Sequence, residues 1–274
     1  MLSRSDLQRL ANREKVALGV LEKDFVLTHV LSALSRVPEL SSELVFKGGT
    51  ALRKVYFPHW RYSEDLDFTV KHTMEKAYLQ LALERWFTQV KQIADIELAT
   101  RMLHKPNGYA RARIQYLGPL AYPGMIYMDL SFDEPVCLEP ELRSIITSPF
   151  NEEFGKVLVY PLEELMAEKI RSLMERGKSR DYYDVWRVLK DHGTQISFEE
   201  LGRVLRQKLE HKGLHPITID EFLPADPDNV KRYWNEDLGQ QVNALPAFES
   251  AIEELQNLLK TLVAPHLSFR TSFG

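Results

Sequence analysis

The sequence predicts a mixed α/β domain over residues 1–160, followed by a helical domain over residues 161–274, in one bilobed body. Before residue 160, segments with the three-and-four spacing of buried helix faces alternate with short apolar runs typical of strands. From Pro161 onward the spacing is helical almost throughout. The chain has 274 residues, 44% of them hydrophobic, which is enough for two such domains.

The cysteine count, the apolar runs and the net charge limit the classes of protein to which the chain can belong. The single cysteine, Cys137, cannot form an internal disulfide. The N-terminal sequence MLSRSDLQRLANREK lacks the unbroken apolar core of a signal peptide, and no later apolar run is long enough to cross a bilayer. The net charge is −4, so any RNA must bind to a local basic patch. We therefore expect a cytoplasmic protein with no membrane partner.

Residues 5–35 carry the helical spacing of apolar side chains that predicts one or two helices. Within them lies the charged triplet Glu22-Lys23-Asp24. A run of charges on a helix is usually a solvated face, and we interpret this one in that way.

Residues 44–70 hold the pattern around which the chain is organised. The apolar run Leu44–Phe46 leads into Gly48 and Gly49, and a short helical pattern follows over residues 50–56. A strand that enters two glycines and then a helix leaves unpaired N–H groups beside a turn without Cβ atoms, so a phosphate can approach closely. The glycine pair is a candidate phosphate cradle. The alternative is that it is only a tight connection.

Two carboxylates follow on the next predicted strand. Asp65 and Asp67 are two residues apart and share one face, while Leu66 and Phe68 share the other. Adjacent carboxylates repel one another unless a cation lies between them, and such oxygen ligands suit Mg²⁺ that carries substrate phosphates. The pair therefore indicates metal-assisted phosphoryl or nucleotidyl transfer. The alternative is a solvated strand face.

These residues resemble a known family. The resemblance is carried by Gly48-Gly49-Thr50 and by Arg61-x-Ser63-x-Asp65-x-Asp67. Together they are similar to the signature of the AbiEii/AbiGii-type nucleotidyltransferase toxins, members of the DNA polymerase β-like nucleotidyltransferase superfamily. The resemblance implies a polymerase β-like domain, an NTP substrate bound by Gly48, Gly49, Thr50 and Ser63, and Mg²⁺ as the cofactor, with Mn²⁺ as an alternative.

The family resemblance also implies a biological role. It predicts a growth-inhibiting toxin that transfers NMP to an RNA acceptor such as the tRNA 3′ end, and that is paired with a separately encoded antitoxin. The acceptor and the preferred NTP are not specified by any motif in the chain.

The segment after the acidic strand predicts a helix over residues 74–90 and then a hairpin. Its turn is Lys105-Pro106-Asn107-Gly108, whose residues favour a tight reversal. In the second strand of this hairpin Arg111 and Arg113 share a face. They meet either phosphates or solvent, and solvent is the more ordinary partner for surface charges.

Residues 124–132 form a strand-like run with Asp129 in its apolar middle. A buried aspartate is costly unless it is paired or bound to metal. The superfamily takes a third carboxylate from a strand neighbouring the first two, which implies Asp129 as a metal ligand beside Asp65 and Asp67. Asp133 is the competing residue, but it lies at the strand end before Pro135, where a turn aspartate is ordinary.

A second motif lies in the helical region. A helix with the apolar stripe Leu162, Leu165, Met166, Ile170 and Leu173 is predicted to end at Gly177, and another to follow. Lys169 and the string Arg180-Asp181-x-x-Asp184 resemble the family's second signature. This implies catalytic roles for Lys169 and Asp184, and nucleotide binding by Lys169, Arg180 and Asp181. The alternative is a set of helix-surface ion pairs worth ~0–1 kcal/mol.

The remaining residues, 197–267, predict a small helical bundle. Its helix starts are indicated by capping boxes at Ser197 and Thr218, by Asp226-Pro227, and by Pro246 as the opening of the last helix. The sequence as a whole favours a Mg²⁺-dependent nucleotidyltransferase. A metal-dependent phosphohydrolase and a non-catalytic nucleotide-binding module are the two alternatives.

Overall fold

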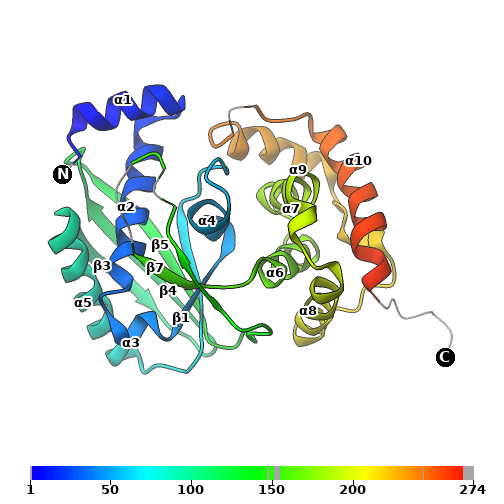
Figure 1. The fold of residues 1–274 in the computed structure, drawn as a ribbon, viewed down its shortest axis with the longest axis horizontal. Coiled ribbons are helices and arrows are strands. Elements are labelled where there is room, and N and C mark those ends of the chain that lie inside the picture. Colours follow the sequence, from blue (N-terminus) through cyan, green and yellow to red (C-terminus); the bar gives the residue numbers. More distant parts are fainter. Residues whose placement is uncertain (1, 147, 151–154, 243, 268–274) are drawn as a thin grey trace. The chain divides into compact units, whose positions relative to one another are not determined.

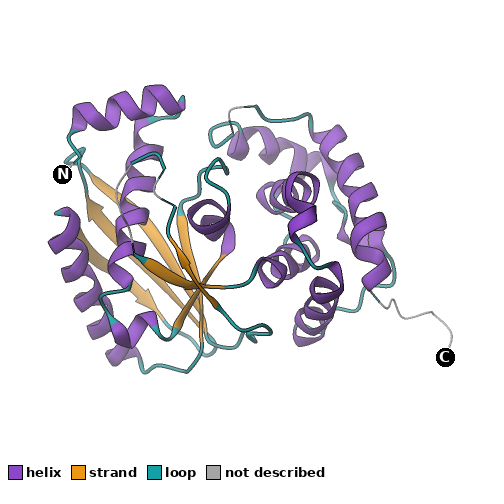
Figure 2. Cartoon of the chain, in the orientation of Figure 1, coloured by secondary structure: helices purple, strands orange, loops and turns teal. Residues whose placement is uncertain are grey.

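The computed structural model describes residues 2–146, 148–150, 155–242 and 244–267. The chain divides into two compact units, of which the first comprises Met1–Val136 with Pro140–Tyr160 and the second Cys137–Glu139 with Pro161–Gly274. The first unit contains both helices and strands, and the described elements of the second unit are helices (Figures 1 and 2). The predicted mixed α/β fold is confirmed.

The first unit is built on one seven-stranded sheet in the order β3-β4-β5-β2-β1-β7-β6. The strands are β1 (Leu44–Lys47), β2 (Asp65–Val70), β3 (Glu97–His104), β4 (Tyr109–Leu117), β5 (Pro123–Ser131), β6 (Glu141–Ser144) and β7 (Lys156–Val159). The pairs β2–β5 and β1–β7 are parallel, and the other pairs are antiparallel. The helices are α1 (Arg4–Glu14), α2 (Leu18–Leu34), α3 (Pro38–Ser41), α4 (Gly48–Ala51), which continues as the π-helical turn η1 (Leu52–Tyr56), and α5 (Lys76–Ala94).

The two faces of this sheet differ because side chains alternate along each strand. On β2, Leu66 and Phe68 are fully buried, and the ring of Phe68 packs edge-on at 6.1 Å from Trp86 of α5. Helices α2 and α5 lie on this side of the sheet, and α4 lies on the other (Figure 1). The face opposite α2 and α5 therefore carries Asp65 and Asp67.

Most of the predicted elements of this unit are confirmed. The helical spacing of residues 5–35 forms α1 and α2, and that of residues 74–90 forms α5. The predicted hairpin is β3 and β4, joined through a turn in which Gly108 has a φ of +75°. Helix α3 and the short strands β6 and β7 were not predicted, because segments of four residues are too short to show a period.

The expectation that the triplet Glu22-Lys23-Asp24 is a solvated helix face is wrong. Asp24 is 1% exposed, and its carboxylate pairs with Lys54 at 2.8 Å and with Arg53 at 3.0 Å. Glu22 is also buried and accepts a hydrogen bond from the backbone N–H of Leu120. The physical reason is that the partners of Asp24 and Glu22 come from segments distant in the sequence, which a local charge pattern cannot reveal.

The second unit consists of packed helices. They are α6 (Leu162–Glu175), α7 (Ser179–His192), α8 (Phe198–His211), α9 (Pro227–Tyr233) and α10 (Phe248–Leu258), with the shorter turns η2 (Gly193–Gln195), η3 (Ile219–Phe222), η4 (Trp234–Leu238), η5 (Leu259–Val263) and η6 (Ala264–His266). The ring of Trp234 lies 5.9 Å from that of Tyr183 and 5.6 Å from that of Phe248. This aromatic cluster joins α7 to the C-terminal helices.

The predicted helix starts are largely confirmed. Ser197 and Asp226 accept hydrogen bonds from backbone N–H groups of α8 and α9, and Thr218 forms a capping box at η3. Pro246 does not open the last helix, since α10 begins at Phe248. In the described ranges no helix is both long and apolar enough to cross a membrane.

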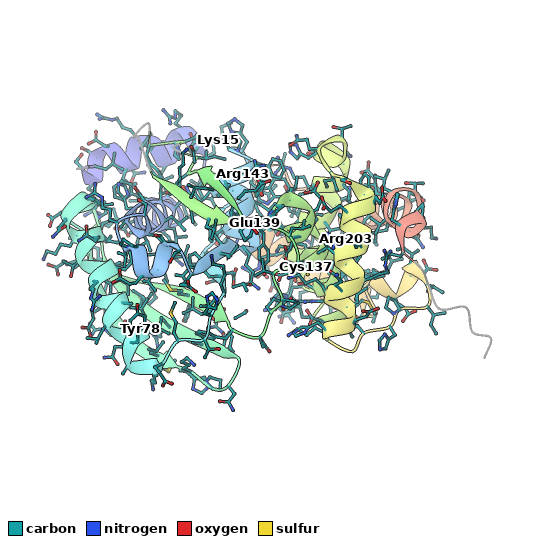
Figure 3. The ribbon with its side chains drawn as sticks, turned by 60° about the horizontal axis from the view of Figure 1, so that its bottom comes forward. Lys15, Tyr78, Cys137, Glu139, Arg143 and Arg203 are labelled. Carbon is teal, nitrogen blue, oxygen red and sulfur yellow. The ribbon has the colours of Figure 1, made fainter. Side chains whose placement is uncertain are left out.

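Three residues that precede β6 belong to the second unit (Figure 3, where Cys137 and Glu139 are labelled). The buried carboxylate of Glu164 accepts hydrogen bonds from the N–H groups of Cys137, at 2.9 Å, and Leu138, at 2.8 Å. The ammonium of Lys208, also fully buried, lies 2.8 Å from Glu164. Residues 137–139 are thus fixed to α6 by a charged anchor.

Candidate active site

Asp65 and Asp67 lie at the start of β2, near the middle of the sheet, and both are half-buried. In the register of the sheet Asp67 stands between Lys47 of β1 and Asp129 of β5. Asp65 stands opposite Tyr127. The structure therefore brings all three predicted metal ligands to neighbouring positions on two adjacent strands.

A larger residue would clash at either glycine, because side chains of the same motif approach Gly48 and Gly49 closely. Gly48 has a φ of +79°, and a Cβ on it would lie 2.2 Å from Oδ2 of Asp67. A Cβ on Gly49 would lie 2.8 Å from Nη2 of Arg61 and 3.4 Å from Oγ of Ser63. The glycine pair therefore forms a tight connection, which was the simpler alternative. Its close neighbours are side chains of the acidic strand and of the segment that leads into it.

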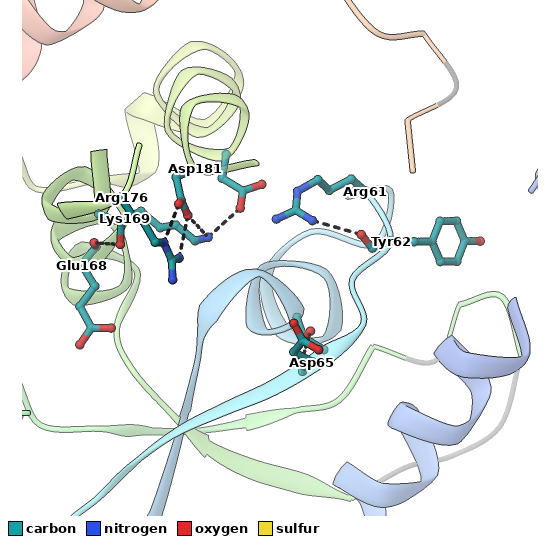
Figure 4. A network of polar contacts seen from close by, with 10 residues as sticks. Arg61, Tyr62, Asp65, Glu168, Lys169, Arg176 and Asp181 are labelled. Carbon is teal, nitrogen blue, oxygen red and sulfur yellow. Dashed lines mark hydrogen bonds and ion pairs between the residues drawn. The ribbon is translucent and has the colours of Figure 1, made fainter. Parts of the chain in front are cut away.

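Thr50 and Arg61 hold the backbone of this motif. The hydroxyl of Thr50, which is 1% exposed, donates to the carbonyl of Asp65 at 2.5 Å. The guanidinium of Arg61 donates to the carbonyl of Tyr62 at 3.2 Å (Figure 4). The prediction for Thr50 was that it binds nucleotide. In the structure its hydroxyl binds the backbone at the start of β2, the strand that carries both carboxylates. Arg61 was part of the quoted motif, but its position beside Gly49 was not predicted.

Asp129 has two partners from β4. The hydroxyl of Tyr109 donates to Oδ1 of Asp129 at 2.5 Å, and Nε of Arg111 lies 3.4 Å from the same oxygen. Burial, together with the hydrogen bond to Asp129, raises the pKa of Tyr109 above its usual value. The sequence predicted that Arg111 and Arg113 share a strand face, but not the register that brings Arg111 and Tyr109 to Asp129.

The carboxylates at this site fit one particular mode of Mg²⁺ binding. In the described part of the chain no group of three or more His, Cys, Asp or Glu side chains is arranged to hold a metal ion. Mg²⁺ does not need such a cage, because it retains several waters and binds through one or two carboxylates plus substrate phosphates. Asp65 and Asp67 suit that mode. Asp129 would have to exchange its contacts with Tyr109 and Arg111 to join them.

The second motif forms a buried ion cluster between α6 and α7. The ammonium of Lys169 lies 3.2 Å from Asp181 and 2.9 Å from Asp184. The side chain of Lys169 is 8% exposed, and those of Asp181 and Asp184 are 3% and 0% exposed. Gly177, with a φ of +49°, makes the reversal that sets the two helices side by side. The alternative of surface ion pairs is therefore wrong.

Arg176 completes this cluster. Its Nε and Nη2 donate to the two carboxylate oxygens of Asp181 at 2.8 and 3.0 Å, a bidentate contact (Figure 4). Burial would raise the pKa of Asp181, but the charges of Lys169 and Arg176 outweigh burial and hold the pKa well below its usual value. Asp181 is therefore a fixed anion that orients two cations.

Arg180 behaves differently from its neighbours. It is half-buried, and no hydrogen bond or ion pair joins its side chain to another residue in the described ranges. The sequence assigned nucleotide binding to Arg180 and none to Arg176. The structure places Arg176, which follows the last residue of α6, in the ion cluster instead.

Two solved structures share this fold. MenT4, a nucleotidyltransferase toxin from Mycobacterium tuberculosis H37Rv, matches with a TM-score of 0.72 at 20% identity, over 97% of this chain and 92% of that one. A putative nucleotidyltransferase from H. pylori matches with a TM-score of 0.55 at 17% identity, over 92% of this chain and 97% of that one. No curated protein matches the sequence.

The chain thus has the fold of these two solved structures, built around the seven-stranded mixed sheet. The sequence profile described as "Nucleotidyl transferase AbiEii toxin, Type IV TA system" matches residues 30–257. The chain belongs to this AbiEii family of nucleotidyltransferase toxins from type IV toxin–antitoxin systems. The family resemblance drawn from the two motifs is confirmed.

Proposed function

We propose that this nucleotidyltransferase transfers NMP from an NTP to a hydroxyl of an RNA acceptor, such as the tRNA 3′ end. The observation that carries the proposal is the approach of Gly48 to the carboxylate of Asp67, because it sets a turn without side chains directly beside the acidic strand. A triphosphate could approach that turn while its phosphate oxygens meet a cation held by Asp65 and Asp67.

In the proposed reaction the acceptor oxygen attacks the α-phosphorus of the NTP. A new P–O bond forms, the bond to pyrophosphate breaks, and the hydroxyl proton passes to solvent. Asp65 and Asp67, with Asp129, are the residues that would hold Mg²⁺ or Mn²⁺, and the bound ion would stabilise charge on the phosphate oxygens. Gly48, Gly49 and Ser63 would border the triphosphate, and Thr50 would fix the strand.

The second motif supplies the remaining proposed roles. Lys169 is already neutralised by Asp181 and Asp184, so we propose that it acts from a fixed position rather than as a mobile charge. Arg180, which has no ion pair in the described ranges, is the cation of this motif best able to take a phosphate. Asp181 and Asp184 would hold the lysine in its orientation.

The family implies further partners. We propose that a separately encoded antitoxin neutralises this toxin and that the protein acts in the cytoplasm, where NTPs and RNA are available. A second function, hydrolysis of a phosphate ester by the same carboxylates, would release phosphate or pyrophosphate without labelling any acceptor.

The test incubates the purified protein with each α-labelled NTP, Mg²⁺ and total RNA, and follows the label into RNA on a denaturing gel. We expect incorporation that Asp65→Asn or Asp67→Asn abolishes, since an amide removes the charge at nearly constant shape. Asp129→Asn should also lose activity, whereas Asp133→Asn, at the competing candidate for the third ligand, serves as the matched control and should retain it. Release of free phosphate with unlabelled RNA would favour the phosphohydrolase.

A further inference from the structure

Two rows of side chains run across the sheet of the first unit from the carboxylates on β2 to β4, which neighbours the edge strand β3. One row follows the register from Asp67 through Asp129 to Arg111. The other follows it from Asp65 through Tyr127 to Arg113. The strands β2, β5 and β4 are successive neighbours, so each row spans about 9.5 Å at ordinary strand spacing.

On strands β3 and β4, arginine side chains are exposed on the face of the sheet that carries the carboxylates. On β4 the alanines and Ile114 are fully buried beneath the sheet, while Arg111 and Arg113 are exposed on the carboxylate side. Arg101 of β3 reaches the same side, where it donates to the side chain of Gln115 at 2.5 Å. A chain of net charge −4 therefore gathers three guanidinium groups on one strip that begins at its carboxylate pair.

Arg111 is engaged with Asp129 and with the ring of Tyr127, whereas Arg113 differs from it. Arg113 is exposed, and in the described ranges no ion pair or hydrogen bond engages its side chain. Tyr127 is half-exposed, and the guanidinium of Arg111 lies over its ring at 5.0 Å. A free cation beside an aromatic ring is the pairing that binds single-stranded nucleic acid, where phosphates meet arginines and bases stack on rings.

We propose that the acceptor strand of a single-stranded RNA end lies across this strip, which comprises Arg101, Arg111, Arg113 and Tyr127. Arg113 contacts a backbone phosphate, and Tyr127 stacks with a base close to the 3′ hydroxyl that receives the nucleotide. The inference rests on the proposed function, because the strip begins at the carboxylates to which that hydroxyl must be brought. Negative charge on the RNA complements the strip, whereas an acidic protein would lack bases to stack.

The experiment compares three variants in transfer to a short single-stranded RNA with a free 3′ hydroxyl. Arg113→Gln should raise the KM for RNA and reduce the salt slope of RNA binding by about 0.7 per lost phosphate contact. Tyr127→Leu should weaken RNA binding about ten-fold or more, and Tyr127→Phe, which keeps the ring, should not. Nucleotide binding measured without RNA should stay unchanged in Arg113→Gln.

Arg36→Gln is the matched control, because Arg36 is another exposed arginine of the first unit without an ion pair in the described ranges. It should match the wild type in KM and salt slope. Wild-type KM and salt slope in Arg113→Gln would overturn the inference while leaving the transferase activity standing. An Arg113→Gln effect confined to a protein acceptor, with RNA labelled normally, would also overturn it. Failure of the wild type to label any acceptor would instead reject the proposed function.

Discussion

The carboxylate of Asp24 lies 2.8 Å from the ammonium of Lys54, and each of these side chains is 1% exposed. Arg53 also pairs with Asp24 and donates to the carbonyl of Trp60. Helix α2 is thereby connected through a buried ion cluster to η1 and to the segment that leads into the acidic strand. The cluster holds the backbone at Trp60, which leads to Ser63 and Asp65.

Asp24→Asn should therefore destabilise the first unit strongly. Removing one partner leaves Lys54 and Arg53 as buried cations without their counterion, which typically costs about 3–5 kcal/mol. Glu64→Gln breaks the more exposed ion pair with Lys23 and should cost under about 1 kcal/mol. Urea unfolding of both variants measures the difference. Equal urea midpoints would show that the buried cluster contributes no more to the free energy of unfolding than a surface ion pair does.

Gly48→Ala should lower both stability and activity. An alanine at a φ of +79° costs about 1–2 kcal/mol, and its Cβ would displace the carboxylate of Asp67. Gly19→Ala is the matched control, since a Cβ at this helical position meets nothing within 4 Å and alanine favours the helix by about 0.5–1 kcal/mol. Thermal melting and the transfer assay should separate the two. Wild-type activity in Gly48→Ala would contradict the role given to this turn.

Lys169→Ala should weaken NTP binding. Loss of a charge-assisted phosphate contact is typically worth about 1.5–3 kcal/mol, which calorimetric titration with the NTP can measure. Arg187→Ala removes the more exposed pair of Arg187 with Asp191 on α7 and should leave the affinity unchanged. If Lys169→Ala bound the NTP as tightly as Arg187→Ala does, the buried cluster would have only a structural role.

The low pKa of Asp181 predicts a loss of stability in acid. The pKa of this group is lowered in the folded state, so its stabilisation is fully present above the unfolded value of 3.8 and is lost as the pH falls toward the folded value. In Asp181→Asn the dependence of unfolding free energy on pH below 3.8 should be shallower by up to about 1.4 kcal/mol per pH unit. Urea unfolding at a series of acidic pH values checks the slope. Parallel slopes for wild type and variant would contradict the assignment.

The sequence predicted those features that depend on local order. The helix at residues 162–175, the turn at Gly177 and the alternation of Arg111 with Ala112 were all readable from spacing along one segment. The carboxylates of Asp65 and Asp67 were placed correctly on one strand face for the same reason.

What the sequence could not supply were the partners that come from distant segments. Arg53 and Lys54 reach Asp24 across about thirty residues, and Tyr109 reaches Asp129 only because β4 and β5 pair in one register. A register shift of one residue would turn Arg111 to the buried face. Such contacts depend on the fold as a whole, so a charged triplet such as that at Asp24 looked solvated.

The anchor between Glu164 and the segment Cys137–Glu139 has a consequence for dissecting the chain. A cut after Tyr160 leaves that segment on the first fragment, although it belongs to the second unit. The second fragment would then keep Glu164 and Lys208 buried, while Glu164 would lack the two N–H groups that it accepts from. We expect residues 161–274 to fold as a stable fragment only when a peptide covering residues 137–139 is joined to it. The two units therefore cannot be separated by a single cut of the chain.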